Sequence, residues 1–190
     1  LSQFDGNMLV EAGLLISVDN KPPYDRFRDR LMLPIQDARG RVIAFGGRIL
    51  QAKEGAAKYL NSPDTPLFDK GRTLYNLHRA GPVSRQSGRT VVVEGYMDVI
   101  ALSEAGFPAV VAPLGTAITE DQLRLLWRMA PEPIIALDGD TAGLRAAMRA
   151  IDVALPLLEA GQSLRFALMP EGQDPDDLIR AQGAGAMRKV

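Results

Sequence analysis

The 190-residue sequence contains no cysteine, a single histidine and no long apolar run. Without cysteine there is no disulfide framework, no cysteine-based zinc site and no thiol nucleophile. The lone His78 also excludes most serine–histidine–aspartate triads and sites that need several histidine ligands. No apolar run approaches the ~20 residues that span a bilayer. Any chemistry must therefore rest on carboxylates, Lys and Arg side chains, hydroxyls and backbone groups.

The remaining composition is that of a globular protein, with 46% hydrophobic and 24% charged residues. The net charge of −1 hides an uneven distribution. Residues 21–89 carry 14 Lys and Arg against 6 Asp and Glu, whereas residues 90–190 carry 8 against 14. This contrast favours a polyanionic partner for the basic part and a divalent metal for the acidic part. Two ordinary solvated surfaces are the alternative.

The basic part shows the pattern of a small mixed subdomain. Two β-like runs, 31–35 and 41–45, flank Asp37-Ala-Arg-Gly40, which has the residue types of a hairpin turn. Pro34 places the first run at a sheet edge or at a bulge, and Gly46-Gly47 marks a bend or a close approach of backbones. Residues 51–73 lack periodicity and predict a long loop or a set of turns.

From residue 90 onward, short apolar runs alternate with helical patterns. The runs are 90–93, 109–112, 133–137 and 163–169, and the predicted helices are 96–105, 119–129, 141–160 and 175–182. Thr119 begins a capping box, Pro156 predicts a break in the third helix, and Pro175 begins the fourth. Apolar strands that alternate with helices predict an α/β fold with a parallel sheet covered on both faces. We expect domains at 1–89 and 90–190.

Acidic residues follow three of the four predicted strands, at the point where each strand ends. Glu94 follows the first run, with Asp98 one helical turn later. Asp138-Gly-Asp140 follows the third run, and Asp174-Pro-Asp176 comes after the fourth. Ligands of open α/β sheets bind beyond the carboxyl ends of the strands, so we expect these acids to meet at one rim.

Clustered carboxylates repel one another unless a cation compensates, and Mg²⁺ is the hard cation that accepts a few carboxylates together with waters and phosphates. The sequence therefore predicts a divalent-metal site with ligands from Glu94, Asp98, Asp138, Asp140, Asp174 and Asp176. The alternative is that Asp138 or Asp140, and the acids of 174–177, cap the helices that follow them.

Cations in the basic part have the setting of a nucleic-acid surface. Arg26, Arg28 and Arg30 alternate, and in an extended stretch they would share one face. Arg48 follows two glycines, and Lys58-Tyr-Leu-Asn61 and Lys70-Gly-Arg72 lie in the irregular stretch. Lys and Arg beside aromatic residues suit a phosphate backbone with stacked bases. Surface solubility is the alternative for any single one of them.

In combination the motifs resemble a Toprim domain. They are Glu94-Gly-Tyr-Met-Asp98, Leu114-Gly-Thr116, Asp138-Gly-Asp140-Thr-Ala-Gly143 and Asp174-Pro-Asp176. The upstream segments make the chain similar, more narrowly, to bacterial DnaG-type primases. These segments are Arg28-Asp-Arg30, 40–48, Lys58-Tyr-Leu-Asn-Ser-Pro63 and Phe68-Asp-Lys-Gly71. The resemblance extends from about Leu9 to Gly183.

The resemblance implies a Toprim-type sheet preceded by part of a basic α+β subdomain, in an RNA polymerase that makes primers on single-stranded DNA. By position it makes Glu94, Asp138 and Asp140 the central catalytic set, with Asp98, Asp174 and Asp176 as supporting metal ligands. The positions that contact nucleic acid or nucleotide are Arg28, Arg48, Lys58, Asn61 and Lys70. The expected cofactor is Mg²⁺, with Mn²⁺ as a substitute, and the expected mechanism is two-metal phosphoryl transfer.

The resemblance also implies partners and a location. The expected partners are a single-stranded DNA template, nucleoside triphosphates and, through a domain absent from the chain, the replicative helicase. The expected location is the bacterial cytoplasm at the replication fork, and not a membrane. Family members carry a zinc-binding domain, which a chain without cysteine cannot contain, and further helical domains. We therefore expect a fragment of the catalytic core with no zinc site.

Three other functions remain open from the residues alone. A topoisomerase or nuclease would use the same metal site to cleave DNA. A phosphotransferase would use Asp138 as a nucleophile and Asp176-Asp177 as a metal pair, although such sheets normally begin with the nucleophile strand and here two runs precede it. A non-catalytic scaffold would bind nucleic acid without taking up Mg²⁺ at the acidic residues.

Overall fold

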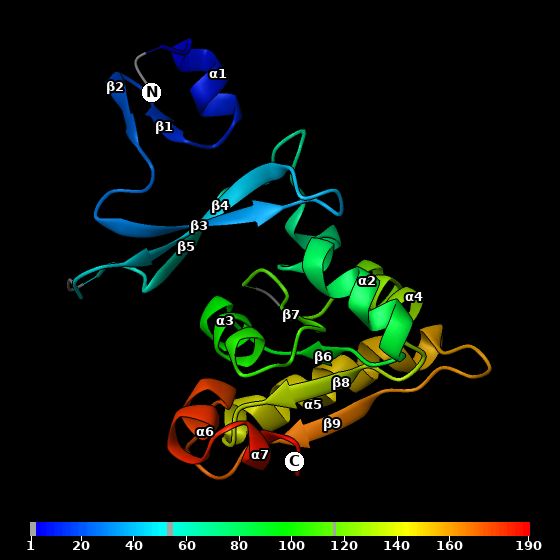
Figure 1. Ribbon diagram of the computed structural model, residues 1–190. Coiled ribbons are helices and arrows are strands. Elements are labelled where there is room, and N and C mark those ends of the chain that lie inside the picture. The colour runs from blue at the N-terminus through cyan, green and yellow to red at the C-terminus, as the bar shows by residue number, and fades with distance from the viewer. Residues whose placement is uncertain (1–2, 53–54, 116) are drawn as a thin grey trace. The chain divides into compact units, whose positions relative to one another are not determined.

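The computed structural model describes residues 3–52, 55–115 and 117–190, and the chain forms two compact units (Figure 1). The first unit comprises residues 1–37 and 41–69, and the second comprises 38–40 and 70–190. Within the described residues, no helix combines the length and the apolar character of a bilayer-spanning segment.

The first unit is a small α+β structure. Helix α1 (Gly6–Glu11) precedes an antiparallel pair, β1 (Leu15–Val18) and β2 (Lys21–Asp25). A three-stranded antiparallel sheet follows, in the order β3-β4-β5, formed by β3 (Arg30–Gln36), β4 (Val42–Ile49) and β5 (Tyr59–Asn61).

The predicted hairpin is confirmed, because β3 and β4 pair in antiparallel register and Gly40 has a left-handed φ of 81°. Pro34 lies in β3, which is an edge strand, as predicted. Gly47 marks a close approach, since a Cβ there would lie 2.8 Å from Phe27 Cδ1 and 3.0 Å from Arg30 Cδ. Strands β2 and β5 were not predicted, because β2 is exposed along its whole length and contains two prolines, and β5 has only three residues.

The second unit is built on a parallel sheet in the order β7-β6-β8-β9. Its strands are β6 (Val91–Val92), β7 (Val110–Val111), β8 (Ile134–Leu137) and β9 (Arg165–Leu168). Its longer connecting helices are α3 (Tyr96–Glu104), α4 (Glu120–Met129), α5 (Thr141–Ala154) and α6 (Pro175–Gln182), and α7 (Ala184–Met187) follows. These elements confirm the four predicted runs and the helices between them.

Helices cover both faces of this sheet, which confirms the predicted α/β layering (Figure 1). On one face Val92 and Ile135 pack with buried residues of α4 and α5. On the other face Val93 and Ala136 pack with buried residues of α3, α6 and α7. Alternate residues of each strand therefore enter opposite cores, which explains why the strands are apolar throughout.

The helix ends follow the predicted signals. Thr119 caps α4, and Gln122 completes the capping box. Helix α5 ends at Ala154, and Pro156 lies in the short 3₁₀ helix η2 (Leu155–Leu157), so the predicted break is confirmed. Pro175 is the first residue of α6.

Helix α2 (Leu77–Ser87), which contains Pro82, was not predicted from the sequence. The residue before it, Asn76, has a left-handed φ of 66° and makes no side-chain cap. Its Nδ2 instead donates to Val110 O at 2.9 Å. The sequence therefore contains an internal proline and no capping signal for this helix. Packing of its buried residues in the second unit stabilises the helix despite both features.

Gly139 and Gly143 lie just after β8, at positions where the neighbouring backbone leaves no room for a side chain. A Cβ on Gly139 would fall on Pro170 O and within 2.5 Å of Met169 O. A Cβ on Gly143 would collide with Asp138 O. Neither glycine has a positive φ, so these positions require space next to the backbone rather than a left-handed conformation. The chain after β9 can therefore lie directly against the chain after β8.

Gly139→Ala is expected to lower the free energy of unfolding by about 3 kcal/mol, because backbone atoms cannot yield to the new methyl group. Gly185→Ala is the matched control, since Gly185 lies in α7 with nothing within 4 Å of its Cβ position. Urea unfolding of both variants checks the prediction. Equal stability of the two variants would contradict it.

Candidate metal centre

Three adjacent parallel strands bring the acidic residues to one rim of the second unit. Glu94 lies two residues beyond β6, Asp138 directly follows β8, and Asp174 comes after β9. Because β6 pairs with β8 and β8 pairs with β9 in parallel, their carboxyl ends lie side by side. The structure thus brings together acids that lie far apart in the sequence, with Glu94 and Asp176 separated by 82 positions.

Asp138 is at the centre of this cluster. Burial, and to a lesser extent the charges of the neighbouring acids, together raise the pKa of Asp138 to about 7. These acids are Glu94, Asp98, Asp174 and Asp140. Its Oδ1 is buried and has no hydrogen-bond partner among the described residues. A buried carboxylate oxygen without a donor and next to four other acids is a site that favours a cation.

Asp98 lies on α3 one turn beyond Glu94 and is almost fully buried. Burial raises its pKa to about 6, as does the charge of Asp174, while the backbone N–H groups of Asp176 and Gly95 act in the opposite direction. The Gly95 N–H donates to Asp98 Oδ2 at 3.2 Å. The backbone therefore holds Asp98 in place beside the α6 acids.

Two of the predicted ligands also cap helices. Asp140 Oδ1 accepts from Gly143 N at 2.7 Å at the start of α5, and Asp174 Oδ1 accepts from Asp177 N at 2.7 Å at the start of α6. Each cap occupies one carboxylate oxygen, so capping and metal binding are compatible. Asp176 differs, because its Oδ1 accepts from Arg180 Nε at 2.8 Å.

The carboxylate oxygens at the rim are suitable ligands for a metal ion, although they do not surround one on all sides. The described part of the chain contains no group of three or more His, Cys, Asp or Glu side chains placed to hold one ion. Mg²⁺ usually takes only one or two carboxylates and keeps several waters. The oxygen donors of Glu94, Asp138 and Asp140 suit such an ion, which would also relieve their mutual repulsion.

Lys70 belongs to the same unit as the acids, in the 3₁₀ helix η1 (Lys70–Arg72). The fully buried Gln122 holds this segment, since its Nε2 donates to Lys70 O and to Thr73 O, each at 2.9 Å. Thr119 Oγ1 donates to Gly71 O at 2.5 Å. The sequence indicates only the capping box that begins at Thr119, because the other contacts of Gln122 are with residues about 50 positions earlier. Thr116 of the Toprim-like motif lies outside the described residues.

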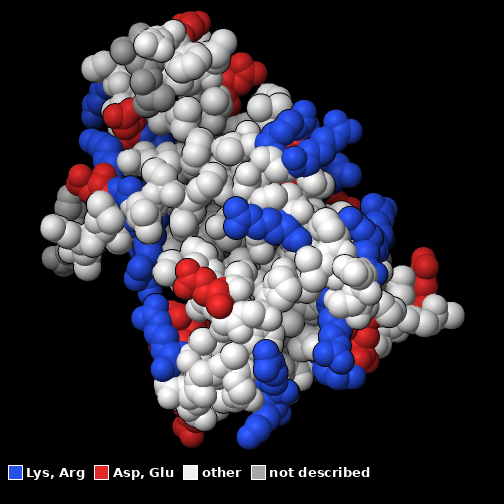
Figure 2. All heavy atoms as spheres, viewed as in Figure 1, with Lys and Arg blue, Asp and Glu red and all other residues white. Residues whose placement is uncertain are grey.

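The other predicted contacts, Arg28, Arg48, Lys58 and Asn61, lie in the first unit, where Lys and Arg side chains reach the surface with acidic side chains among them (Figure 2). Arg48 pairs with Tyr59, and Asn61 pairs with Gly46, so Arg48 and Asn61 share one face of the sheet. Lys58 Nζ lies 5.8 Å from the centre of the Tyr59 ring.

Arg26, Arg28 and Arg30 would share one face only in an extended stretch, and this stretch is not extended. Residues 26–27 form a bend and residues 28–29 a turn, in which Asp29 has a left-handed φ of 54°. Arg30 lies in β3 and donates to Gly47 O at 3.1 Å, and Arg26 is partly buried. Only Arg28 of the three is exposed, and its Cζ lies 4.8 Å from the centre of the Tyr24 ring.

A four-stranded parallel sheet with acids at the ends of its strands is the architecture of a Toprim domain, and residues 88–167 match the Toprim domain family. Residues 2–81 match the family described as DNA primase catalytic core, N-terminal domain. The chain belongs to the DNA primase family, in its catalytic core. The two matches leave residues 82–87 unassigned, and neither of them gives a boundary at residue 89. The predicted domains 1–89 and 90–190 therefore stay a prediction.

The similar proteins include DNA primase of Pseudomonas aeruginosa, which is 50% identical over 181 residues, 95% of this chain and 27% of that protein. The crystal structure of a DNA primase domain from P. aeruginosa has a TM-score of 0.91 at 49% identity, over 96% of this chain and 57% of that one. A structure of the DnaG primase catalytic domain bound to single-stranded DNA has a TM-score of 0.87 at 48% identity, over 96% and 58%. The chain thus spans about a quarter of the length of that curated relative.

The raised pKa of Asp138 predicts a pH-dependent stability in metal-free buffer. A carboxyl whose pKa is higher in the folded than in the unfolded state destabilises the fold as it ionises. This loss develops as the pH rises from the ordinary value of 3.8 through about 7. Asp138→Asn is therefore expected to raise the free energy of unfolding by about 1 kcal/mol at pH 8, after discounting for solvent screening, and to change little near pH 4.

Urea unfolding in EDTA between pH 4 and pH 8 measures this effect. Asp152→Asn, on the exposed side of α5, is the matched control and should behave as the wild type throughout. A stability of Asp138→Asn equal to the wild type at pH 8 would show that burial and the neighbouring carboxylates do not raise the pKa of Asp138 as described.

Proposed function

We propose that this chain supplies the catalytic core of a DNA primase, which makes short RNA primers on single-stranded DNA from nucleoside triphosphates. The observation that carries the proposal is the convergence of Glu94, Asp98, Asp138 and Asp174 at one rim of a Toprim sheet. The preceding residues, which match the N-terminal domain of the primase core, favour a primase over a topoisomerase or a nuclease.

The proposed metal is Mg²⁺, with Mn²⁺ as a substitute. Glu94, Asp138 and Asp140 would hold it, and Asp98, Asp174 and Asp176 would support them. When bound, two such ions lower the pKa of the attacking hydroxyl and stabilise the charge of the leaving phosphate. The side chains of the protein contribute position and charge rather than covalent chemistry.

The basic residues would position the two substrates. We assign Arg28, Arg48, Lys58, Asn61 and Lys70 to contacts with template and nucleotide. On one sheet face Arg48 provides a charge and Asn61 a neutral amide that can hydrogen-bond to phosphate or base. Arg28 beside Tyr24 and Lys58 beside Tyr59 provide charge next to rings on which bases can stack. A solved relative described as bound to single-stranded DNA supports this assignment.

The whole protein would act at the bacterial replication fork in the cytoplasm, with the replicative helicase as a partner. The bacterial DNA primases among its relatives support this location. The phosphotransferase alternative fares worse, because Asp138 follows β8, the third strand of its sheet in chain order, and not the first.

Glu94→Gln is expected to lower primer synthesis about a hundredfold or more, because the substitution removes a charged metal ligand at the reacting centre. The assay uses a chimera of P. aeruginosa DNA primase in which residues 1–190 of this chain replace the similar segment. Single-stranded DNA binding by this variant should match that of the unmodified chimera. Full primer synthesis would contradict the assignment of Glu94.

Two variants serve as controls in the same chimera. Glu104→Gln makes the same chemical change at an exposed residue at the end of α3 and should leave synthesis intact. Lys58→Ala should weaken DNA binding and reduce its salt dependence by about one ion. An unchanged salt dependence would remove Lys58 from the DNA surface.

A further inference from the structure

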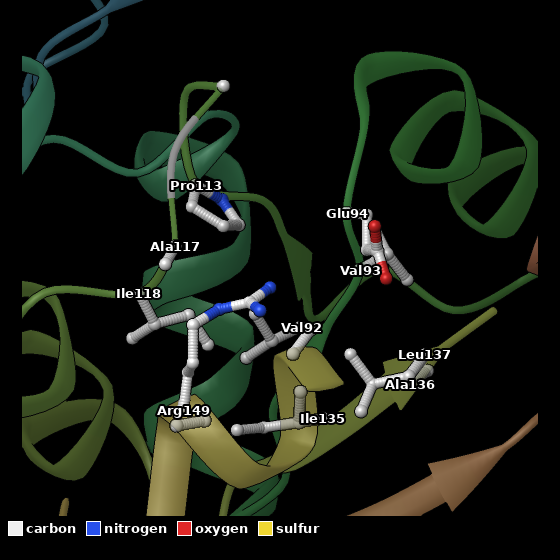
Figure 3. A pocket seen from close by; sticks show the side chains of 13 residues that line it. Val92, Val93, Glu94, Pro113, Ala117, Ile118, Ile135, Ala136, Leu137 and Arg149 are labelled. Atoms are coloured by element: carbon white, nitrogen blue, oxygen red, sulfur yellow. The ribbon is translucent and has the colours of Figure 1, made fainter. Parts of the chain in front are cut away.

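A pocket of about 310 Å³ lies beside the acidic rim in the second unit (Figure 3). Its lining combines the end of β6, the last three residues of β8, one side of α5 and, after β7, Pro113, Gly115, Ala117 and Ile118. The chain passes from β6 to β7 on one side and then crosses to β8 on the other, so the pocket lies where the strand order reverses. This switch point is where open α/β sheets bind their ligands.

Arg149 is the cation that lines this pocket, and its guanidinium points into the hollow (Figure 3). It forms no hydrogen bond or ion pair with any residue that the structure describes. Its neighbour on α5, Arg145, does not line the pocket. An Arg side chain that points into a cavity without a protein partner is available to an anionic ligand.

The other walls divide the pocket into two kinds of surface. Val92, Ile135 and Ala146 form an apolar part, whereas Glu94 of the candidate metal centre lies across the hollow from Arg149 (Figure 3). A ligand that suits this lining has a flat, weakly polar part, an anionic part for Arg149 and an affinity for the cations that Glu94 would hold. Nucleoside triphosphates have all three.

We propose that Arg149 binds a phosphate group of a nucleoside triphosphate held in this pocket. The inference rests on the proposed function and adds to it a nucleotide-binding residue on α5. The volume is at the lower end of small-molecule pockets, which favours a mononucleotide over a track for a nucleic-acid strand. The guanidinium fork can donate two hydrogen bonds to one phosphate.

Calorimetric titration of ATP into the 190-residue chain, with Mn²⁺ present, tests the proposal. Arg149→Ala should weaken ATP binding about tenfold, since it removes a charge-assisted hydrogen bond. Arg149→Lys should fall between this variant and the wild type, because it keeps the charge and loses the fork. Arg145→Ala, the matched control on the same helix, should bind ATP within twofold of the wild type.

Thermal unfolding of Arg149→Ala should match that of Arg145→Ala, which separates loss of a contact from loss of the fold. ATP binding by Arg149→Ala equal to that of the wild type would overturn the proposal. A larger loss for an oligothymidine single strand than for ATP would also overturn it, because Arg149 would then hold a backbone phosphate.

Primer synthesis by the chimera separates this inference from the proposed function. In an active chimera, Arg149→Ala should raise the KM for nucleotides about tenfold and leave kcat within twofold. An active chimera without that change contradicts the role of Arg149 alone. A chimera that makes no primers contradicts the proposed function.

Discussion

Repulsion among carboxylates at one rim is the constraint that shapes the second unit. Parallel pairing of β6, β8 and β9 places their carboxyl ends side by side, and each strand delivers an acid there. Burial and neighbouring charges raise the pKa of Asp138 to about 7, so the fold accepts an electrostatic cost at this point. Gly139 and Gly143 allow the backbone segments to approach closely enough to create that cost. A cation at the rim would turn the same geometry into a favourable one.

Much of this arrangement could be predicted from the sequence because its signals are local. The continuous apolar runs indicated strands buried on both faces, and the acids after them indicated the rim. Thr119, Pro156 and Pro175 fixed helix ends correctly because caps and prolines act on neighbouring backbone groups.

The remainder depends on contacts that no local pattern carries. Helix α2 contains Pro82 and begins at Asn76 without a side-chain cap, so only tertiary packing reveals it. The bend and turn at residues 26–29 exclude the common face that an extended stretch would give to three arginines. Arg149 attracted no notice in the sequence, since its significance comes from a pocket assembled by β6, β8 and α5.

An anomalous difference map from a crystal of this chain soaked in Mn²⁺ measures the central claim most directly. The account predicts a peak within coordination distance of the Asp138 carboxylate, shared with Glu94 or Asp140, and loss of that peak in Asp138→Asn. The absence of a peak at these carboxylates in the wild type, or a peak only at other acids, would contradict the account.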